Sequence, residues 1–407
     1  MTVAHLAVKT IDGSVSAPAG FRSAGVACGI KKTGALDLAL IASDTTASAA
    51  AVFTTNKAQA APVTVSQQRL RGSSGRARAV AINSGCANAC TGPDGHATAE
   101  AMADATAAAT GAAPSEVLIA STGVIGVALD RERVTSGILS AAASLSRDGG
   151  PHAARAIMTT DPFPKEAAVE LTTPVGTFRV GGIAKGSGMI EPLMATMLAV
   201  VTTDAEVVPA LLQRALAAVT DVTFNAITVD GECSTNDCVF ALANGASGIA
   251  LGEGQFDLLV EALRLVCEPL AIGIVRGGEG ATKLVTVEVT GGRSAIEAKR
   301  AARAIANSPL VKTAVHGADP NWGRLVAVAG RAGVDFVLDR ARVQIGDVEL
   351  FAGGRPFDER AETASTHLQG KDVRLHVDLG TGGTGSARMW TCDLSADYVK
   401  INAEYRT

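Results

Sequence analysis

The chain has 407 residues, enough for two or three lobes with hydrophobic cores of their own. Hydrophobic residues make up 47% of it and charged residues 19%, which excludes a disordered chain and indicates a folded globular protein. A net charge of −4 without a long basic run leaves no electrostatic footprint for nucleic acid, so small-molecule partners are expected.

Membrane, secretion and metal signals are also missing from the sequence. No apolar run reaches the roughly 18 residues that a membrane helix needs, and the N-terminus has no basic flank of the kind found in signal peptides. The seven cysteines form no CxxC pair and no metal-type cluster with histidine, which favours reduced, buried thiols. We therefore expect a cytoplasmic protein with no membrane partner and no metal.

Strand-like and helix-like segments alternate along the chain, and this indicates an α/β protein. Strands are expected at 36–42, 49–54, 77–82, 117–120 and 284–290, with a hairpin at 170–180. Helices are expected at 97–109, 132–146, 206–219, 256–267 and 294–306, and the last hundred residues look mostly strand-like.

The stretch Gly380-Thr-Gly-Gly-Thr-Gly385 has the spacing of a dinucleotide-binding loop. Such a loop needs a helix after it, because the pyrophosphate sits on the helix N-terminus. Residues 386–392 instead alternate like a strand, so we interpret the stretch as the turn of a hairpin.

Thr196 stands at the start of an apolar run that follows the loop Lys185-Gly-Ser-Gly188. From the residues alone, a threonine in a buried strand is by default a packed structural residue. The alternative is a self-exposed nucleophile, in which the Thr196 hydroxyl attacks the Ala195 carbonyl and the resulting ester hydrolyses. The freed α-amine, with an ordinary pKa near 7.7–8.0, would then act as base for its own hydroxyl.

The segment 185–204 resembles the processing site of the ornithine acetyltransferase (glutamate N-acetyltransferase) family of arginine biosynthesis. Further stretches resemble the same family, in the family's order: Asn83-Ser-Gly-Cys-Ala-Asn-Ala-Cys-Thr-Gly92, Ser121-Thr-Gly-Val-Ile-Gly126, Ala156-Ile-Met-Thr-Thr-Asp161, Asp230-Gly-Glu-Cys-Ser-Thr-Asn-Asp237, Glu279-Gly-Ala-Thr-Lys283, Asn307-Ser-Pro-Leu-Val-Lys-Thr-Ala314, Asp319-Pro-Asn-Trp-Gly-Arg324 and Asn402-Ala-Glu-Tyr-Arg-Thr407. These blocks span most of the chain.

The resemblance implies an N-terminal-nucleophile-like, aminopeptidase-related α/β fold with stacked sheets and flanking helices. It implies cleavage between Ala195 and Thr196 into an α chain (1–195) and a β chain (196–407), which interleave in one catalytic unit and assemble as an α2β2 heterotetramer. The family reaction is ping-pong: Thr196 takes an acetyl group from N-acetylornithine and passes it to glutamate. No metal or organic cofactor takes part.

The resemblance also implies the site residues. Thr122 (hydroxyl) and Gly123 (backbone N–H) match the oxyanion hole. Substrate contacts match Thr159 (or the adjacent Thr160), Lys185, Glu279, Asn402 and Thr407, together with Thr196 itself. Without the family, Thr122 and Gly123 suit an ordinary turn, Lys185 a solvated loop lysine and Glu279 an exposed loop glutamate.

Several alternatives stay open on the sequence. Acetyl-CoA is a second donor in part of the family, and no residue here decides whether it serves this chain. A related aminopeptidase or amidohydrolase would pass the acyl group to water, and a paralogue of specialised metabolism would use another acyl group. A protein that is not an enzyme, such as an unprocessed ligand-binding or scaffold protein, would keep the chain intact.

Overall fold

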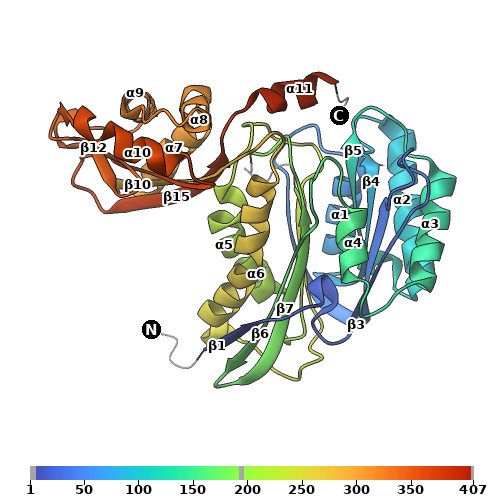
Figure 1. Cartoon of the computed structure of the whole chain (residues 1–407). Helices are drawn as coiled ribbons and strands as arrows, with labels where there is room; N and C mark the ends of the chain where they lie inside the picture. Colours follow the sequence, from blue (N-terminus) through green and yellow to red (C-terminus); the bar gives the residue numbers. More distant parts are fainter. Residues whose placement is uncertain (1–5, 192–196, 405–407) are drawn as a thin grey trace. The chain divides into compact units, whose positions relative to one another are not determined.

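The computed structural model describes residues 6–191 and 197–404 and divides into two compact units (Figure 1). As far as they are described, unit 1 comprises residues 1–225 and 232–274, and unit 2 comprises 226–231 and 275–406. Both units combine helices with a sheet, which confirms the expected α/β class. Residues from both sides of the expected cleavage point contribute to unit 1.

The described residues of unit 1 form a nine-stranded sheet. Its strands are β1 (Ala7–Thr10), β2 (Phe21–Val26), β3 (Leu38–Phe53), β4 (Arg76–Cys86), β5 (Val117–Val124), β6 (Lys165–Thr173), β7 (Gly176–Lys185), β8 (Leu198–Thr203) and β9 (Cys238–Ala243). They lie in the order β1-β6-β7-β8-β9-β3-β4-β5, with β2 paired to β3. The pairs β4–β5 and β8–β9 are parallel. Parallel neighbours need long crossovers, and helices α2 and α5 lie in these two connections.

The helices of unit 1 are α1 (Ala61–Gly72), α2 (Gly92–Thr110), α3 (Arg131–Ala143), α4 (Gly150–Ala156), α5 (Pro209–Val222) and α6 (Phe256–Arg276), the last of which ends in unit 2. On β3, Leu38 and Leu40 belong to a buried cluster with residues of α2 and α3, whereas Ala39 and Ile41 belong to another. Successive strand side chains point to opposite faces, so both faces of this part of the sheet are buried. This explains the continuous apolar runs of these strands.

The sheet of unit 1 curls so that its two halves share one core. One buried cluster contains both Ile183 of β7 and Leu118 of β5, although four strands separate β7 from β5 in the sheet. On β7, a Cβ added to Gly182 would lie 2.9 Å from a side-chain carbon of Val266, so α6 packs closely on this strand. The stacked layers with flanking helices are therefore present within unit 1.

Unit 2 contains a six-stranded sheet in the order β13-β12-β11-β14-β10-β15. Its strands are β10 (Leu284–Gly292), β11 (Arg342–Ile345), β12 (Val348–Ala352), β13 (Arg355–Pro356), β14 (Asp372–Asp378) and β15 (Gly385–Cys392). Its helices are α7 (Ala295–Ala306), α8 (Pro309–His316), α9 (Trp322–Gly330), α10 (Ala361–Leu368) and α11 (Ala396–Glu404).

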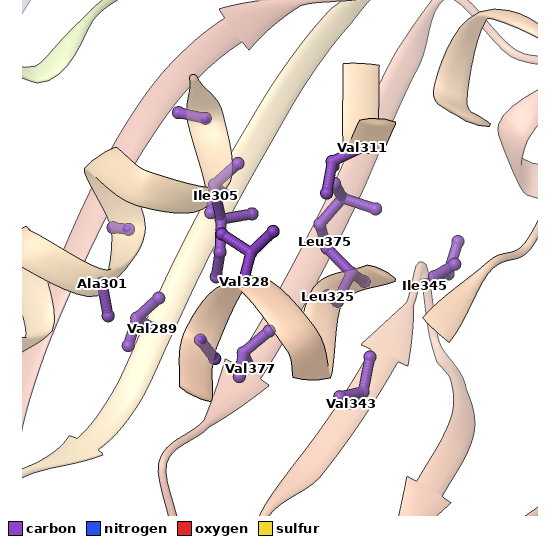
Figure 2. Close-up of a cluster of buried hydrophobic side chains, with 14 of the residues drawn as sticks. Val289, Ala301, Ile305, Val311, Leu325, Val328, Val343, Ile345, Leu375 and Val377 are labelled. Carbon is purple, nitrogen blue, oxygen red and sulfur yellow. The ribbon is translucent and has the colours of Figure 1, made fainter. Parts of the chain in front are cut away.

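The core of unit 2 forms where α7 packs on the sheet. Ser294 caps this helix, because its side chain accepts a hydrogen bond from Glu297 N at 3.3 Å. The apolar face of α7 recurs every three or four residues, and Figure 2 shows Ala301 and Ile305 of this face in the same cluster as Val289 of β10. Four of the five buried residues of α7 are alanines, and these small side chains allow close packing between the helix and the sheet.

Most of the early elements were predicted correctly. The helices expected at 97–109, 132–146, 206–219, 256–267 and 294–306 correspond to α2, α3, α5, α6 and α7, and the hairpin is β6–β7. The strands expected at 36–42 and 49–54 are wrong as separate elements, because β3 is continuous. Asp44, Thr45 and Thr46 are exposed in its middle, where the register with β4 shifts, so a polar bulge was interpreted as a break.

Two expectations for the C-terminal region are wrong. The last hundred residues also contain helices α8 to α11, and α8 carries ordinary start signals: Pro309 at its first position and Ser308, which accepts from Val311 N at 3.4 Å. Residues 380–385 are not a hairpin turn, because β10 lies between β14 and β15 and pairs with both.

Two further features concern the cysteines and the helices of the described residues. All seven cysteines are free thiols, but only four of them are buried, since Cys28 and Cys233 are partly exposed and Cys90 is exposed. Within 6–191 and 197–404, no helix has the length and apolar character needed to cross a membrane.

Candidate functional site

The predicted oxyanion residues lie where β5 ends against β4. Gly123 has φ +129°, and a Cβ at this position would lie only 2.3 Å from the carbonyl carbon of Gly85. Only glycine fits, because any side chain would both strain the backbone and collide with β4. The register between the two strands shifts here, with Cys86 paired to both Thr122 and Val124. Thr122 is buried at this irregularity, with 8% of its surface exposed.

Buried polar side chains hold this strand end in place. The Ser121 hydroxyl donates to Asn83 Oδ1 at 2.5 Å. Asn236 Nδ2 donates to the Ser121 carbonyl at 2.9 Å and to the Ala87 carbonyl at 2.6 Å. Three connected segments thus fix the backbone beside Thr122, which is the rigidity that a preorganised oxyanion hole needs.

Lys185 is the last residue of β7, and its ammonium reaches the same place. Only 4% of its surface is exposed, and Nζ donates to Thr122 Oγ1 at 3.1 Å. Lys185 is thus not a solvated loop lysine. In the antiparallel pair β7–β8 it stands opposite Leu198. Because the Thr122 oxygen accepts this hydrogen bond, its own hydrogen is free to be donated to another group.

Asp161 is a buried carboxylate that interacts with Lys185, and it was not predicted as a site residue. Its Oδ1 accepts from Lys165 Nζ at 2.5 Å and from Gly186 N at 2.8 Å, and its Oδ2 accepts from Thr159 N at 3.0 Å. Burial by itself would raise the pKa of Asp161, but the charges of Lys185 and Lys165 and these hydrogen bonds outweigh it and lower the pKa to about 2. Asp161 is therefore ionised, and it joins the segments of two predicted substrate residues.

Lys31 is a further cation near the cluster that the sequence did not single out. Asp37 shapes its loop: Oδ1 accepts from Cys28 N at 2.7 Å and Oδ2 from Lys31 N at 2.9 Å. Burial lowers the pKa of Lys31, against the opposing effect of the carboxylates of Asp37 and Asp161. The stem of Lys31 packs over Gly85, the residue that approaches Gly123.

Unit 2 brings two other predicted residues together. Glu279 is 6% exposed, and its Oε2 accepts from Asn402 Nδ2 of α11 at 2.9 Å. The next residue, Gly280, has φ +68°, and a Cβ there would lie 2.4 Å from Tyr398 N, so this loop packs tightly on α11. The Ser395 hydroxyl donates to the Gly280 carbonyl at 2.6 Å. The reading of Glu279 as an exposed loop residue is thus wrong.

The predicted site residues therefore fall into three groups. Thr122, Gly123, Thr159 and Lys185 gather in unit 1, and Glu279 and Asn402 form a pair in unit 2. Ala195, Thr196 and Thr407 lie outside the described residues. Within the described ranges, no group of three or more His, Cys, Asp or Glu side chains is arranged to hold a metal ion.

The sequence contains only partial indications of two site residues that were not predicted, Asp161 and Lys165. Asp161 closes the block that contains Thr159, and Lys165 follows it by four residues. Nothing in the sequence shows that these charges are buried together, since their partner Lys185 is 24 positions from Asp161 and reaches it only through the folded sheet.

Sequence comparison matches nearly the whole chain to one family of known proteins. The family model described as ArgJ family matches residues 22–407. The arginine biosynthesis bifunctional protein ArgJ of Synechococcus sp. is 49% identical over 98% of this chain and 99% of its own length. Among solved structures, arginine biosynthesis bifunctional protein ArgJ from Bacillus halodurans is 42% identical, covering 50% of this chain and 97% of that one with a TM-score of 0.48. Ornithine acetyltransferase complexed with ornithine, from Mycobacterium tuberculosis, is 43% identical, covering 47% of this chain and 100% of that one with a TM-score of 0.42.

Proposed function

Because this chain belongs to the ArgJ family, we propose that it transfers an acetyl group from N2-acetyl-L-ornithine to L-glutamate through an acetyl-Thr196 intermediate. The observation that carries the proposal is the buried contact between Lys185 Nζ and Thr122 Oγ1, beside Gly123. It supports the proposal because it brings a cation to the strand end where the Thr122 hydroxyl and the Gly123 N–H would stabilise a developing negative charge.

Self-cleavage comes first in this proposal. The Thr196 hydroxyl oxygen attacks the Ala195 carbonyl carbon, and the peptide C–N bond breaks as the amine takes up a proton. Water then hydrolyses the ester, which leaves a carboxylate on Ala195 and a free α-amine and hydroxyl on Thr196. The products are an α chain (1–195) and a β chain (196–407), which we propose assemble as an α2β2 heterotetramer.

Acetyl transfer then uses the freed amine as general base. It takes the proton of the Thr196 hydroxyl as the oxygen attacks the acetyl carbonyl of the donor. The oxyanion accepts hydrogen bonds from the Thr122 hydroxyl and from Gly123 N–H, and ornithine leaves as it takes up the proton. The α-amine of glutamate attacks the acetyl ester in the second half-reaction, which returns Thr196 to its starting state.

The remaining contacts suit amino-acid substrates. Among the hydrogen bonds of the described residues, Lys185 donates to Thr122, and its ammonium has three N–H donors, so others can contact a substrate carboxylate. The buried carboxylate of Glu279, oriented by Asn402, suits the side-chain ammonium of acetylornithine. We assign Thr159 and Thr407 as further substrate contacts on the strength of the family match alone.

The deciding experiment assays purified protein with glutamate plus either acetylornithine or acetyl-CoA, and runs the same sample on a denaturing gel. Acetylglutamate formation from acetylornithine and two fragments ending and starting at the Ala195–Thr196 bond support the proposal. Acetate release without need for glutamate points to a hydrolase instead. The acetyl-CoA arm tests whether the word bifunctional in the relatives' names applies to this chain.

The matched variant is Thr196→Ala. It removes the hydroxyl that both steps need, so one intact chain without transferase activity is expected. Cleavage or acetyl transfer by this variant would refute Thr196 as nucleophile.

A further inference from the structure

Asp161 is a buried carboxylate that the proposed mechanism does not use. We propose that Asp161 is a positioning residue that holds Lys185 and the Thr159 segment in the arrangement that acetyl transfer requires. The inference rests on the proposed function, and it concerns a residue with no chemical step of its own.

The hydrogen bonds of Asp161 divide between the two segments that it joins. Oδ2 accepts from the backbone of Thr159, and Oδ1 accepts from the backbone of Gly186, directly after Lys185. One rigid group thus sets the distance between the end of β7 and the Thr159 loop. A shift of either oxygen moves the backbone that carries Lys185, and through Lys185 the hydrogen bond to Thr122.

Charge gives the second argument. The side chains of Lys165 and Lys185 are both buried, and a buried ammonium is costly unless an opposite charge is close. Asp161 is the carboxylate that both ammoniums interact with, and Lys165 donates to it directly. Removing the negative charge would leave the ammoniums of Lys165, Lys185 and the nearby Lys31 without this shared counter-charge, and their mutual repulsion would disfavour the position of Lys185 against Thr122.

The same unit contains a matched control. Asp204 is also buried, at 3% exposed, and its carboxylate also accepts two backbone N–H groups: Oδ2 from Ala19 at 2.9 Å and Oδ1 from Arg179 at 2.7 Å. It follows the last residue of β8, whereas Lys185 stands opposite the first. A role confined to holding backbone together would therefore be shared by Asp161 and Asp204.

The test compares Asp161→Asn, Asp161→Glu and Asp204→Asn in the full chain. Each is measured for its unfolding midpoint, the fraction of cleaved chain, and kcat and KM for acetylornithine and glutamate per cleaved chain. We expect kcat/KM to fall by about 10- to 100-fold in Asp161→Asn, with part of the loss in kcat, because small misplacements at an active site cost this much. Asp161→Glu keeps the charge but lengthens the side chain, so an intermediate loss is expected. Asp204→Asn should lower the unfolding midpoint and keep kcat/KM near wild type.

Equal kcat/KM in cleaved Asp161→Asn and Asp204→Asn would overturn the inference, even where both are destabilised. If Asp161→Asn yields no folded protein, Asp161→Glu decides: wild-type kcat/KM overturns the inference and a loss supports it. Wild-type protein that fails to transfer acetyl from acetylornithine rejects the proposed function itself, an outcome distinct from an active wild type with an equally active Asp161→Asn.

Discussion

Thr122→Val is the sharpest test of the proposed oxyanion hole. Valine has nearly the shape of threonine and a high propensity for strands, so the variant removes the hydroxyl with little change in packing. Two consequences are expected. Under the proposed mechanism the transition state loses one of its two donors. In the structure, Nζ of Lys185, a residue only 4% exposed, loses its acceptor at 3.1 Å.

The magnitudes can be separated by assay. Loss of one oxyanion donor costs about 3–4 kcal/mol of barrier, which corresponds to roughly 10²- to 10³-fold in kcat. The unmade hydrogen bond of Lys185 costs about 1–3 kcal/mol of folding free energy. The change in barrier is measured as the rate of acetylglutamate formation per cleaved chain. The change in folding free energy is measured by urea unfolding.

Thr122→Ser is the matched control, because it keeps the hydroxyl that accepts from Lys185 and donates to the oxyanion. Its kcat should stay within a few-fold of wild type. If Thr122→Val turns over as fast as Thr122→Ser, the hydroxyl gives no stabilisation to the transition state and the assignment of Thr122 fails.

Three further predictions concern other parts of the described chain. Gly123→Ala should abolish transfer, since its Cβ would meet the Gly85 carbonyl carbon at 2.3 Å; an active, well-folded variant in the same acetylglutamate assay would contradict this. Asp161 has its pKa lowered from 3.8 to about 2, so its stabilisation is complete above pH 4 and lost as pH falls toward 2. Urea titrations should therefore show wild type losing about 2 kcal/mol more than Asp161→Asn over this range, and equal losses would contradict the ion-pair assignment. Ile305→Ala, in the unit 2 core, should cost about 2–5 kcal/mol of unfolding free energy, whereas the exposed Ile296→Ala should change it by less than about 0.5 kcal/mol.

The sequence predicted elements well where periodicity and breakers agree, as in α7 and the β6–β7 hairpin. It failed on β3, because Asp44, Thr45 and Thr46 are polar for a local reason, a bulge that faces solvent, and no pattern within the strand reveals this. It failed on the order of β14, β10 and β15, because pairing between strands distant in the chain depends on the whole sheet.

Thr122, Gly123 and Lys185 were predicted as site residues from the family resemblance. Their burial and hydrogen bonds became known only from the structure. Lys185 lies in a Gly-rich stretch that suits an exposed loop, yet the fold buries it. Asp161 could not be assigned a role from its neighbours in sequence, because its carboxylate interacts with Lys185 at the end of β7, 24 positions later. Burial and charge pairing of this kind are properties of the folded chain.

The contact between Lys185 and Thr122 also has a consequence for when the chain can act. In the sheet, β7 and β5 are separated by four strands, which in a flat sheet would put them about 24 Å apart at roughly 4.8 Å per strand. The Lys185 ammonium at the end of β7 reaches the Thr122 hydroxyl on β5 only because the sheet curls. A nascent or partly folded chain therefore lacks this contact, so under the proposed mechanism acetyl transfer would begin only once the strands between β7 and β5 have paired.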